Sequence, residues 1–419
     1  KYRYLPLYSV SGLWRISQEP FMASAKWIDN LVVRASYGLQ GNIDKNTSPF
    51  LLGNYRIENI LPGGSEDMID VSGAPNKKLR WEKTHSVNAG FDFAVLNQAI
   101  NLSVDYYYRK GVDLIGTQML PLETGFEMLT VNWASMRNQG VEVALSTRNV
   151  HTKNFMWTTN FNFAYNNNKV LKEALREDAL EPGREGYPAG ALFALKTAGL
   201  DEEGYPMFQD KDGKAVSAME FFKLQEWGFG ATDLTARERR ELYTYVGTAD
   251  CPYTGGFNNT FTYKAFELGV NFSFDFGGKV RSQPTYSIVD FDKGRNTNRD
   301  ILNRWTPENT ETIFPVLLSQ NERLDEYMWY SNQNEIYRNL DIWIRDLNYV
   351  RLQNIRLGYT LPTNFSRTLG MTSATVAIEG RNLLVFGSSY KNYLDPETMS
   401  NAYATPAPKS VTLSLNLIF

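Results

Sequence analysis

Residues 79–109 read LRWEKTHSVNAGFDFAVLNQAINLSVDYYYR, and this stretch decides the fold. Apolar and polar residues alternate from Val87 to Val95, and again from Ile100 to Tyr108, on either side of a short polar turn. Side chains on a strand point alternately to opposite faces, so each run has one apolar face and one polar face. The stretch therefore predicts a long β-hairpin.

The length of these two strands points to a membrane. A strand of a soluble protein usually has about 5 or 6 residues, whereas a tilted strand that crosses a bilayer needs roughly 9 to 11. Both runs reach the longer figure, and Tyr106, Tyr107 and Tyr108 gather at one end of the second run, as in the aromatic girdle of a membrane barrel. A large soluble β-sandwich with long hairpins is the alternative that one hairpin leaves open.

The composition is compatible with both alternatives. The chain has 419 residues, of which 42% are hydrophobic and 14% aromatic, and no apolar run approaches the roughly 18 residues of a spanning helix. In a barrel only every second strand residue faces lipid, so a transmembrane barrel also has a moderate hydrophobic content. A net charge of -3 leaves no basic excess to neutralise phosphates, which argues against nucleic-acid binding.

Cysteine and histidine usage indicates neither an enzyme nor a metal site. Cys251 is the single cysteine, and the two histidines, His85 and His151, have no metal-ligand spacing. The sequence contains no Ser-His-Asp order, phosphate-binding glycine loop or nucleophile elbow. The acidic groups DEEG and DKDG lack the spaced ligands and closing glutamate of an EF-hand, so we expect turns there in preference to calcium sites, and we expect no cofactor.

The same alternation recurs along the chain, and we count eleven strands. They lie near residues 8–16, 31–40, 86–95, 100–108, 138–147, 155–166, 255–263, 266–276, 346–362, 373–387 and 409–419, with a bulge near Gln353 where the parity of the apolar residues changes. Short connections alternate with long ones, which cover about 42–78, 110–135, 166–253, 277–345 and 387–408. Short turns at one rim and long extracellular loops at the other are the organisation of an outer-membrane barrel, and a Greek-key sandwich has no reason to keep this order.

The odd number of strands predicts a larger barrel. An open sheet would leave two edges unpaired in lipid, and single-chain bacterial barrels have an even number of strands. We therefore expect residues 1–419 to be the C-terminal half of a 22-stranded transmembrane antiparallel up-and-down β-barrel, the size of plugged outer-membrane transporters. Lys1 begins inside a pattern already under way, so we expect the signal peptide and plug domain to lie outside this sequence. Phe419 ends the last alternating strand and resembles the assembly signal of bacterial outer-membrane barrels.

Eight blocks of sequence, in order along almost the whole chain, resemble the SusC/RagA-like TonB-linked outer-membrane proteins of Bacteroidetes. They are LRWEKTHSVNAGFDF, VDYYYRK, SMRNQGVEV, ALFALKTAGLDEEGYPMF, GGFNNTFTYKAFELGVNFSFDFGGKV, RWTPENT, DLNYVRLQNIRLGYTLP and EGRNLL. The resemblance implies a TonB-dependent barrel in the cell outer membrane, surrounded by outer-membrane lipid. It also implies energy from the TonB-ExbB-ExbD complex through the missing N-terminal part, and a SusD-like surface lipoprotein as a lid.

The resemblance implies active import of an oligomeric nutrient, most often an oligosaccharide in that family. Oligopeptide import is the alternative within transport, and a passive pore or a surface-binding barrel is the alternative of another class. A soluble enzyme is the weakest interpretation, because no motif in the sequence brings together a nucleophile, a base and an orienting group.

Loop aromatics and carboxamides are the candidate substrate-binding residues. We expect aromatic rings to stack on substrate and carboxamides to form hydrogen bonds with it, although such rings also pack loops together or contact a lid. The candidates are Trp227, Trp305, Tyr327, Trp329, Tyr330, Asn332, Gln333, Asn334 and Trp343.

Overall fold

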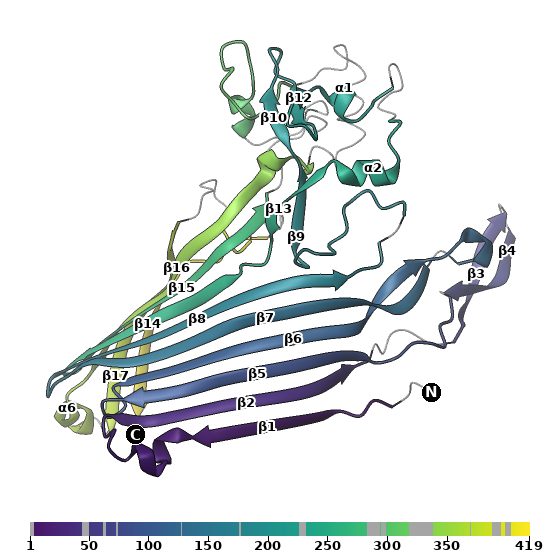
Figure 1. The fold of residues 1–419 in the computed structure, drawn as a ribbon. Coiled ribbons are helices and arrows are strands. Elements are labelled where there is room, and N and C mark those ends of the chain that lie inside the picture. Colours follow the sequence, from purple (N-terminus) through teal and green to yellow (C-terminus); the bar gives the residue numbers. More distant parts are fainter. Residues whose placement is uncertain are drawn as a thin grey trace.

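One antiparallel sheet of eleven strands, strongly curved, forms the body of the molecule (Figure 1). The computed structural model describes residues 4–43, 50–61, 64–72, 74–126, 128–175, 177–225, 232–282, 294, 299–317, 338–368, 370–387, 395–398 and 404–419. In sheet order the strands are β1 (Tyr8–Arg15), β2 (Ile28–Asn42), β5 (Glu82–Val95), β6 (Ile100–Met119), β7 (Met128–His151), β8 (Phe155–Lys172), β14 (Tyr253–Tyr263), β15 (Phe266–Arg281), β16 (Ile344–Thr360), β17 (Ser373–Phe386) and β18 (Ser410–Ile418). The order follows the chain, so the sheet is an up-and-down meander, and the expected all-β fold with eleven strands is confirmed.

The register gives this sheet one apolar face and one polar face. Directly opposed residues of an antiparallel pair lie on the same face. Phe93 of β5 opposes Leu31 of β2 and Leu102 of β6. The same apolar row continues across the sheet through Leu145, Phe161, Phe257, Phe272, Leu352 and Leu384. The alternate residues of each strand form the polar face, so a sequence pattern of period two becomes two chemically different surfaces.

Two aromatic rows bound the apolar face. Tyr165 opposes Tyr253 in one row, and Phe266 opposes Tyr263 and Tyr359 in the other. Tyr253 and Tyr263 are the ends of the 11-residue strand β14. They are therefore about 33 Å apart along the strand at roughly 3.3 Å per residue. A strand tilt of about 40° reduces this to a height of about 25 Å, which matches the apolar band of an outer-membrane barrel.

Tight turns join strand pairs at one rim of the sheet. Residues 96–99, 152–154 and 264–265 connect β5 to β6, β7 to β8, and β14 to β15. Two further connections at this rim contain short helices: η1 (Ile16–Gln18) and η2 (Pro20–Met22) before β2, and α6 (Thr363–Thr368) before β17. The long connections all leave from the opposite rim, as the alternation of short and long segments predicts.

Two of the segments expected as loops contain long strands. β6 continues to Met119 and β7 begins at Met128, so most of residues 110–135 belong to the main sheet, with η3 (Leu122–Thr124) at the tip. Residues 42–78 contain the separate hairpin of β3 (Leu52–Leu61) and β4 (Gly64–Ser72). The sequence pattern ended early because the ladder between β6 and β7 shifts its register after Gly111, and this bulge interrupts the alternation.

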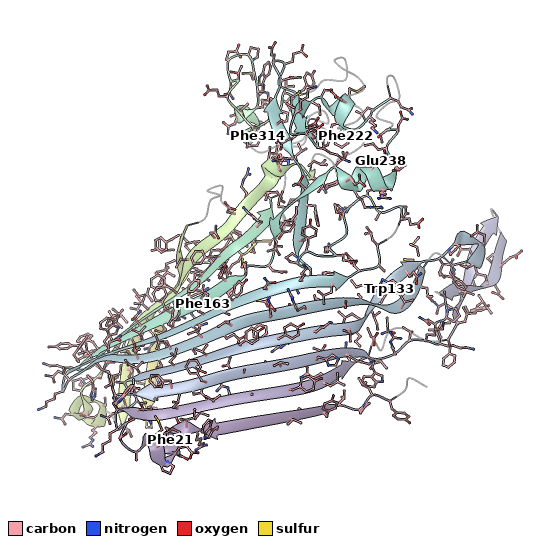
Figure 2. All side chains as sticks on the ribbon, in the orientation of Figure 1. Phe21, Trp133, Phe163, Phe222, Glu238 and Phe314 are labelled. Atoms are coloured by element: carbon pink, nitrogen blue, oxygen red, sulfur yellow. The ribbon has the colours of Figure 1, made fainter. Side chains whose placement is uncertain are left out.

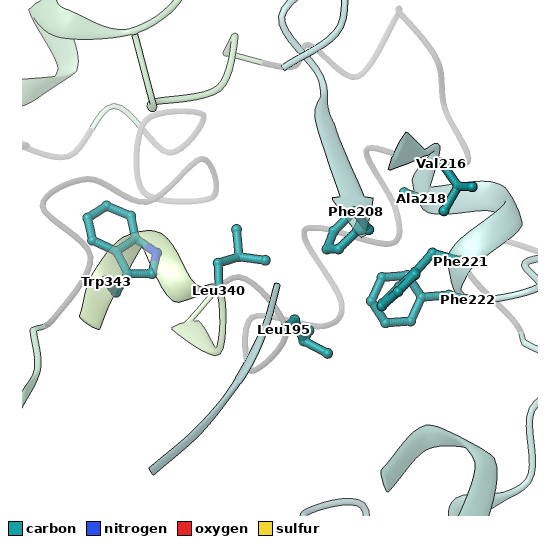
Figure 3. Close-up of a cluster of buried hydrophobic side chains, with 8 residues drawn as sticks. All are labelled: Leu195, Phe208, Val216, Ala218, Phe221, Phe222, Leu340 and Trp343. Atoms are coloured by element: carbon teal, nitrogen blue, oxygen red, sulfur yellow. The ribbon is translucent and has the colours of Figure 1, made fainter. Parts of the chain in front are cut away.

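A cluster of buried hydrophobic side chains lies outside the main sheet, in a layer formed by the long connections. This loop layer contains β9 (Ala191–Leu195), β10 (Thr197–Leu200), β11 (Pro206–Gln209), β12 (Ala215–Val216), α1 (Ala218–Phe221), α2 (Ala236–Glu241), β13 (Tyr243–Thr248), η4 (Arg299–Asn303) and η5 (Asp341–Trp343). Its core consists of Leu195, Phe208, Val216, Ala218, Phe221, Phe222, Leu340 and Trp343 (Figure 3). Residue 195, residues 208–222 and residues 340–343 contribute to this core, so three separate stretches of chain pack together. The loop layer is therefore one packed unit at the rim of the long connections.

The bulge expected near Gln353 is present. In the pairing of β15 with β16, Phe272 opposes Leu352 and Asn271 opposes Asn354, so Gln353 is the extra residue on β16. Its side-chain amide donates a hydrogen bond of 2.7 Å to the Ser273 hydroxyl on β15. Among the described residues, no helix has the length and hydropathy needed to cross a bilayer.

Candidate functional site

The polar face of the sheet is the first part of the candidate site. A hollow of about 550 Å³ lies on this face, and its lining includes Ser11, Arg34, Asn88, Asp105, Tyr107, Arg109 and Glu142. These residues come from β1, β2, β5, β6 and β7, so five neighbouring strands contribute to one surface. A second hollow of about 380 Å³, on β2, β5, β6, β7 and β8, includes Asn101, Ser146 and Asn160. Both surfaces present hydrogen-bonding groups to whatever occupies the inside of the curve.

Arg34 organises the charges of the larger hollow. Its guanidinium forms ion pairs with Asp92 and Asp105, the latter at 2.5 Å, and donates a hydrogen bond of 3.1 Å to Ser103. Ser103 in turn donates to Asp92 at 2.7 Å. Two carboxylates share one guanidinium, so this group of four side chains has a net negative charge. Each of the four side chains forms at least one hydrogen bond within the group.

A glycine makes the contact between Arg34 and Asp105 possible. Gly90 of β5 opposes Arg34 on one side and Asp105 on the other. A Cβ atom at Gly90 would lie 2.2 Å from Oδ1 of Asp105. Only a residue without a side chain leaves the two charged groups free to meet across the middle strand.

Four asparagines form a continuous row on the polar face. Asn258 of β14 opposes Asn160 of β8 and Asn271 of β15, and Asn271 opposes Asn354 of β16. The Oδ1 atom of Asn258 is buried and has no hydrogen-bond partner among the described residues. Each carboxamide offers both donors and an acceptor. The row can therefore bind neutral polar groups, such as hydroxyls or peptide groups, without adding charge.

A buried ion pair holds the last long connection against the polar face. Arg351 of β16 is 1% exposed and pairs with Asp395, which is 8% exposed, and with Glu397 at 2.8 Å. The hydroxyl of Tyr349 donates a hydrogen bond to Asp275 of β15. Residues 395–398 are therefore fixed inside the curve of the sheet, close to β15 and β16.

The structure places two of the expected substrate-binding aromatics in the loop layer, with different exposure. Trp343 is 0% exposed and packs against Phe314 with ring centroids 5.8 Å apart (Figure 2 labels Phe314). Trp343 was expected to stack on substrate, but a ring without exposed surface offers no face to a substrate and instead stabilises the loop core. Trp305 is partly exposed and lies over the backbone of Gly204, where an added Cβ would be 2.5 Å from its Cδ2 atom.

The other expected substrate-binding residues lie outside the described residues. These are Trp227, Tyr327, Trp329, Tyr330, Asn332, Gln333 and Asn334. Phe419 follows β18 and is 83% exposed, and its role as an assembly signal stays a prediction. The charged cluster around Arg34 and the asparagine row were not predicted. Their signal was present as polar residues at alternate positions, but only the register shows which of them meet.

The arrangement is suited to non-covalent recognition. Within the part of the chain that the structure describes, no group of three or more His, Cys, Asp and Glu side chains is arranged to hold a metal ion. The polar face instead provides carboxamides, hydroxyls and paired charges along a wall, with the loop layer above one end of it.

Comparison with known proteins gives consistent results. Residues 7–192 match the family model described as TonB dependent receptor-like, beta-barrel. The chain is 26% identical over 449 residues to TonB-dependent receptor P3 of Formosa agariphila, covering 100% of this chain and 42% of that protein. It is 25% identical over 431 residues to TonB-dependent receptor SusC of Bacteroides thetaiotaomicron, covering 96% of this chain and 39% of SusC. The chain thus spans about two fifths of the length of these curated relatives.

A solved structure has the same fold. The structure of the RagAB peptide transporter superposes with a TM-score of 0.76 at 24% identity, covering 98% of this chain and 43% of that one. The RagAB peptide importer in its open-open state gives a TM-score of 0.75 at 23% identity. The similarity therefore extends over the eleven-stranded sheet and the loop layer.

Proposed function

We infer from these similarities that this chain belongs to the TonB-dependent receptor-like β-barrel family, a family of outer-membrane transporters and not of enzymes. We propose that it forms part of a barrel that imports oligomeric nutrients. In this proposal the short turns face the periplasm and the loop layer faces the outside. The polar face lines the lumen, and the apolar face contacts lipid.

The two-faced eleven-stranded sheet is the observation that carries the proposal. Among the described residues, β1 and β18 each pair with a strand on one side only. Unpaired backbone groups cannot face lipid, so further strands must close the barrel. A 22-stranded barrel, as expected from the odd strand count, would satisfy both edges and would enclose a lumen large enough for a plug. The relatives are long enough to supply those strands, since this chain covers 42% of receptor P3.

Oligosaccharides are the proposed substrates. The asparagine row and the hydroxyls of the polar face suit neutral, hydroxyl-rich ligands, and exposed loop aromatics suit sugar rings. Oligopeptides are the second candidate, because carboxamides bind peptide groups equally well and the similar RagAB structure is that of a peptide transporter. We propose further that a SusD-like surface lipoprotein closes the outer opening and that the TonB-ExbB-ExbD complex supplies energy.

Native mass spectrometry of the full-length protein, extracted gently from its own outer membrane, tests the proposal. We expect a co-migrating lipoprotein and bound masses that differ by a sugar unit. Heterogeneous peptide masses would transfer the proposal to peptides. A barrel without any partner would favour a passive pore, and uptake that survives deletion of the TonB box in the full-length protein would establish that pore.

The loop aromatics outside the described residues allow a direct test of substrate contact. Replacing Trp329 and Tyr330 with Ala should weaken uptake, because it removes the aromatic ring faces on which a sugar ring would stack. Barrel assembly, followed by heat-modifiable migration on gels, should stay unchanged. Uptake equal to that of the wild type would remove both residues from the substrate site.

A further inference from the structure

A row of basic residues crosses four strands on the apolar side of the sheet, near the rim of the long connections. His85 of β5 opposes Lys110 of β6, Lys110 opposes Arg137 of β7, and Arg137 opposes Lys169 of β8. Nothing in the proposed transport function uses these side chains, because they are on the face opposite to the lumen.

The register fixes the face on which this basic row lies. The pairing of β5 with β6 is continuous from Val95 and Ile100 up to His85 and Lys110. Because every second residue shares a face, Lys110 lies on the same side as Ile100 and Tyr106. Arg109, by contrast, lines the hollow on the polar face. The basic row is therefore directed toward the surroundings of the barrel.

Three cations of this row have no compensating charge within the described residues. Lys83, one step closer to the rim, forms an ion pair of 3.0 Å with Asp113. Lys110, Arg137 and Lys169 form none in the part of the chain that the structure describes. The Nε atom of Arg137 is buried and also has no hydrogen-bond partner there.

Like charges in direct opposition destabilise a sheet. Neighbouring strands are about 4.8 Å apart, so Arg137 has one cation on each side at close range. All three residues are half-buried, which limits their screening by water. An anion bound between them would relieve the repulsion and satisfy their unused donors.

The basic row lies at the height of lipid headgroups. Lys110 is four residues beyond Tyr106, and Lys169 is four residues beyond Tyr165, which belongs to the aromatic row at that edge of the apolar band. Four residues span about 13 Å along a tilted strand, or about 10 Å in height. Flexible Lys and Arg side chains can reach down over part of this distance.

We propose that Lys110, Arg137 and Lys169 bind the phosphate group of a phosphate-bearing lipid in the outer leaflet. Arg137 occupies the centre and supplies a planar guanidinium, and the two lysines contact the phosphate oxygens from either side. Tyr108 opposes Gln139, and Gln139 opposes Asn167, so one step below the cations there are further donors for the glycerol or sugar part of the lipid. The proposal rests on the assigned orientation in the membrane and not on the identity of the nutrient.

The test compares two charge-matched double variants of the full-length protein in phosphatidylcholine nanodiscs that contain diphosphoryl lipid A. Lys110→Gln/Lys169→Gln removes two members of the row, and Lys153→Gln/Lys264→Gln removes two lysines at the short-turn rim. Retained lipid A is counted by native mass spectrometry after release into detergent. We expect the first variant to bind lipid A about 25-fold more weakly, at roughly fivefold per basic residue, and the second to bind like the wild type.

Several outcomes would overturn the proposal. Equal losses in both double variants would indicate an effect of net charge alone. Equal binding of dephosphorylated lipid A would exclude a lipid phosphate as the ligand. If the variant that lacks Lys110 and Lys169 loses its lipoprotein partner and keeps its lipid, the basic row binds that partner and not a lipid. Heat-modifiable migration shows that each variant is folded, and nutrient uptake is measured separately, so failure of the import proposal leaves the lipid result interpretable.

Discussion

Arg351 on β16 and Asp395 in the connection between β17 and β18 form an ion pair that is almost completely excluded from solvent. Both oxygens of Asp395 are also used, because Oδ1 accepts the amide of Glu397 at 3.0 Å and Oδ2 accepts the amide of Ala407 at 3.2 Å. The pair therefore links a strand of the barrel wall to both sides of a long connection. In the proposed transporter this contact narrows the lumen near β16.

Removing one partner of this pair should release the connection. Arg351→Met leaves Asp395 as a buried charge without a counter-ion, which costs about 3 to 5 kcal/mol in comparable sites. We expect faster proteolytic cleavage within residues 387–409 of the folded barrel. Arg381→Met is the control, since Arg381 is 62% exposed in its pair with Glu379 and such pairs contribute at most about 1 kcal/mol. Cleavage of the Arg351 variant at the wild-type rate would contradict the anchoring role.

Gly204 and Gly199 form a matched pair for testing the contact with Trp305. Both have positive φ, +86° and +94°, so alanine is strained by about 1 kcal/mol at either position. At Gly199 an added Cβ has no neighbour within 4 Å, whereas at Gly204 it meets the indole of Trp305. Gly204→Ala should therefore increase hydrogen exchange in residues 201–208 clearly more than Gly199→Ala does. Equal exchange would show that the indole moves away without cost.

Alanine substitutions of Trp343 and Trp305 should have different effects on loop stability and on substrate uptake. Trp343→Ala removes a fully buried ring, and we expect the loop layer to lose about 3 to 5 kcal/mol of stability. Trp305→Ala should reduce the stability of the loop layer less, because the ring is partly exposed, and should reduce substrate uptake more. Trypsin resistance of the loop layer and uptake by the intact transporter, measured on both variants, separate the two effects. A reversed order would place Trp343 at the substrate and Trp305 in the core.

The start of α2 should depend on pH. The carboxylate of Glu238 accepts the backbone N–H of Thr235 at 2.9 Å and its hydroxyl at 2.8 Å, and Thr235 accepts the Glu238 amide in return. The backbone hydrogen bond, followed by the hydroxyl, lowers the pKa of Glu238 below its ordinary range. A lowered pKa stabilises the folded helix above the ordinary value, and this contribution is lost as the pH falls through the lowered value.

Hydrogen exchange of residues 236–241, corrected for intrinsic rates, measures this effect. Protection should decrease on acidification below about pH 4. Glu238→Gln should remove most of the dependence, because its amide does not titrate. The pKa of Glu241 is also lowered, mainly by a hydrogen bond from Lys211, so Glu241→Gln provides the comparison. If only Glu241→Gln changes the profile, the capping contact is not its source.

The sequence by itself determined the eleven strands of the main sheet and their two-faced character. These properties are local, because alternation along a strand places residues on opposite faces whatever the partner strand is. The bulge at Gln353 was also predictable, since one extra residue on β16 relative to β15 changes the parity of the apolar positions. The long ends of β6 and β7 were missed because a bulge interrupts the pattern on which such predictions rely.

Only the tertiary structure decided which side chains meet. Arg34 reaches Asp105 across Gly90, 71 residues away, and Arg351 reaches Asp395, 44 residues away. Neither the burial of Trp343 nor the alignment of Lys110 with Arg137 and Lys169 has a local signal. Register and loop packing fix these contacts, and both depend on the pairing of strands that are distant in the chain.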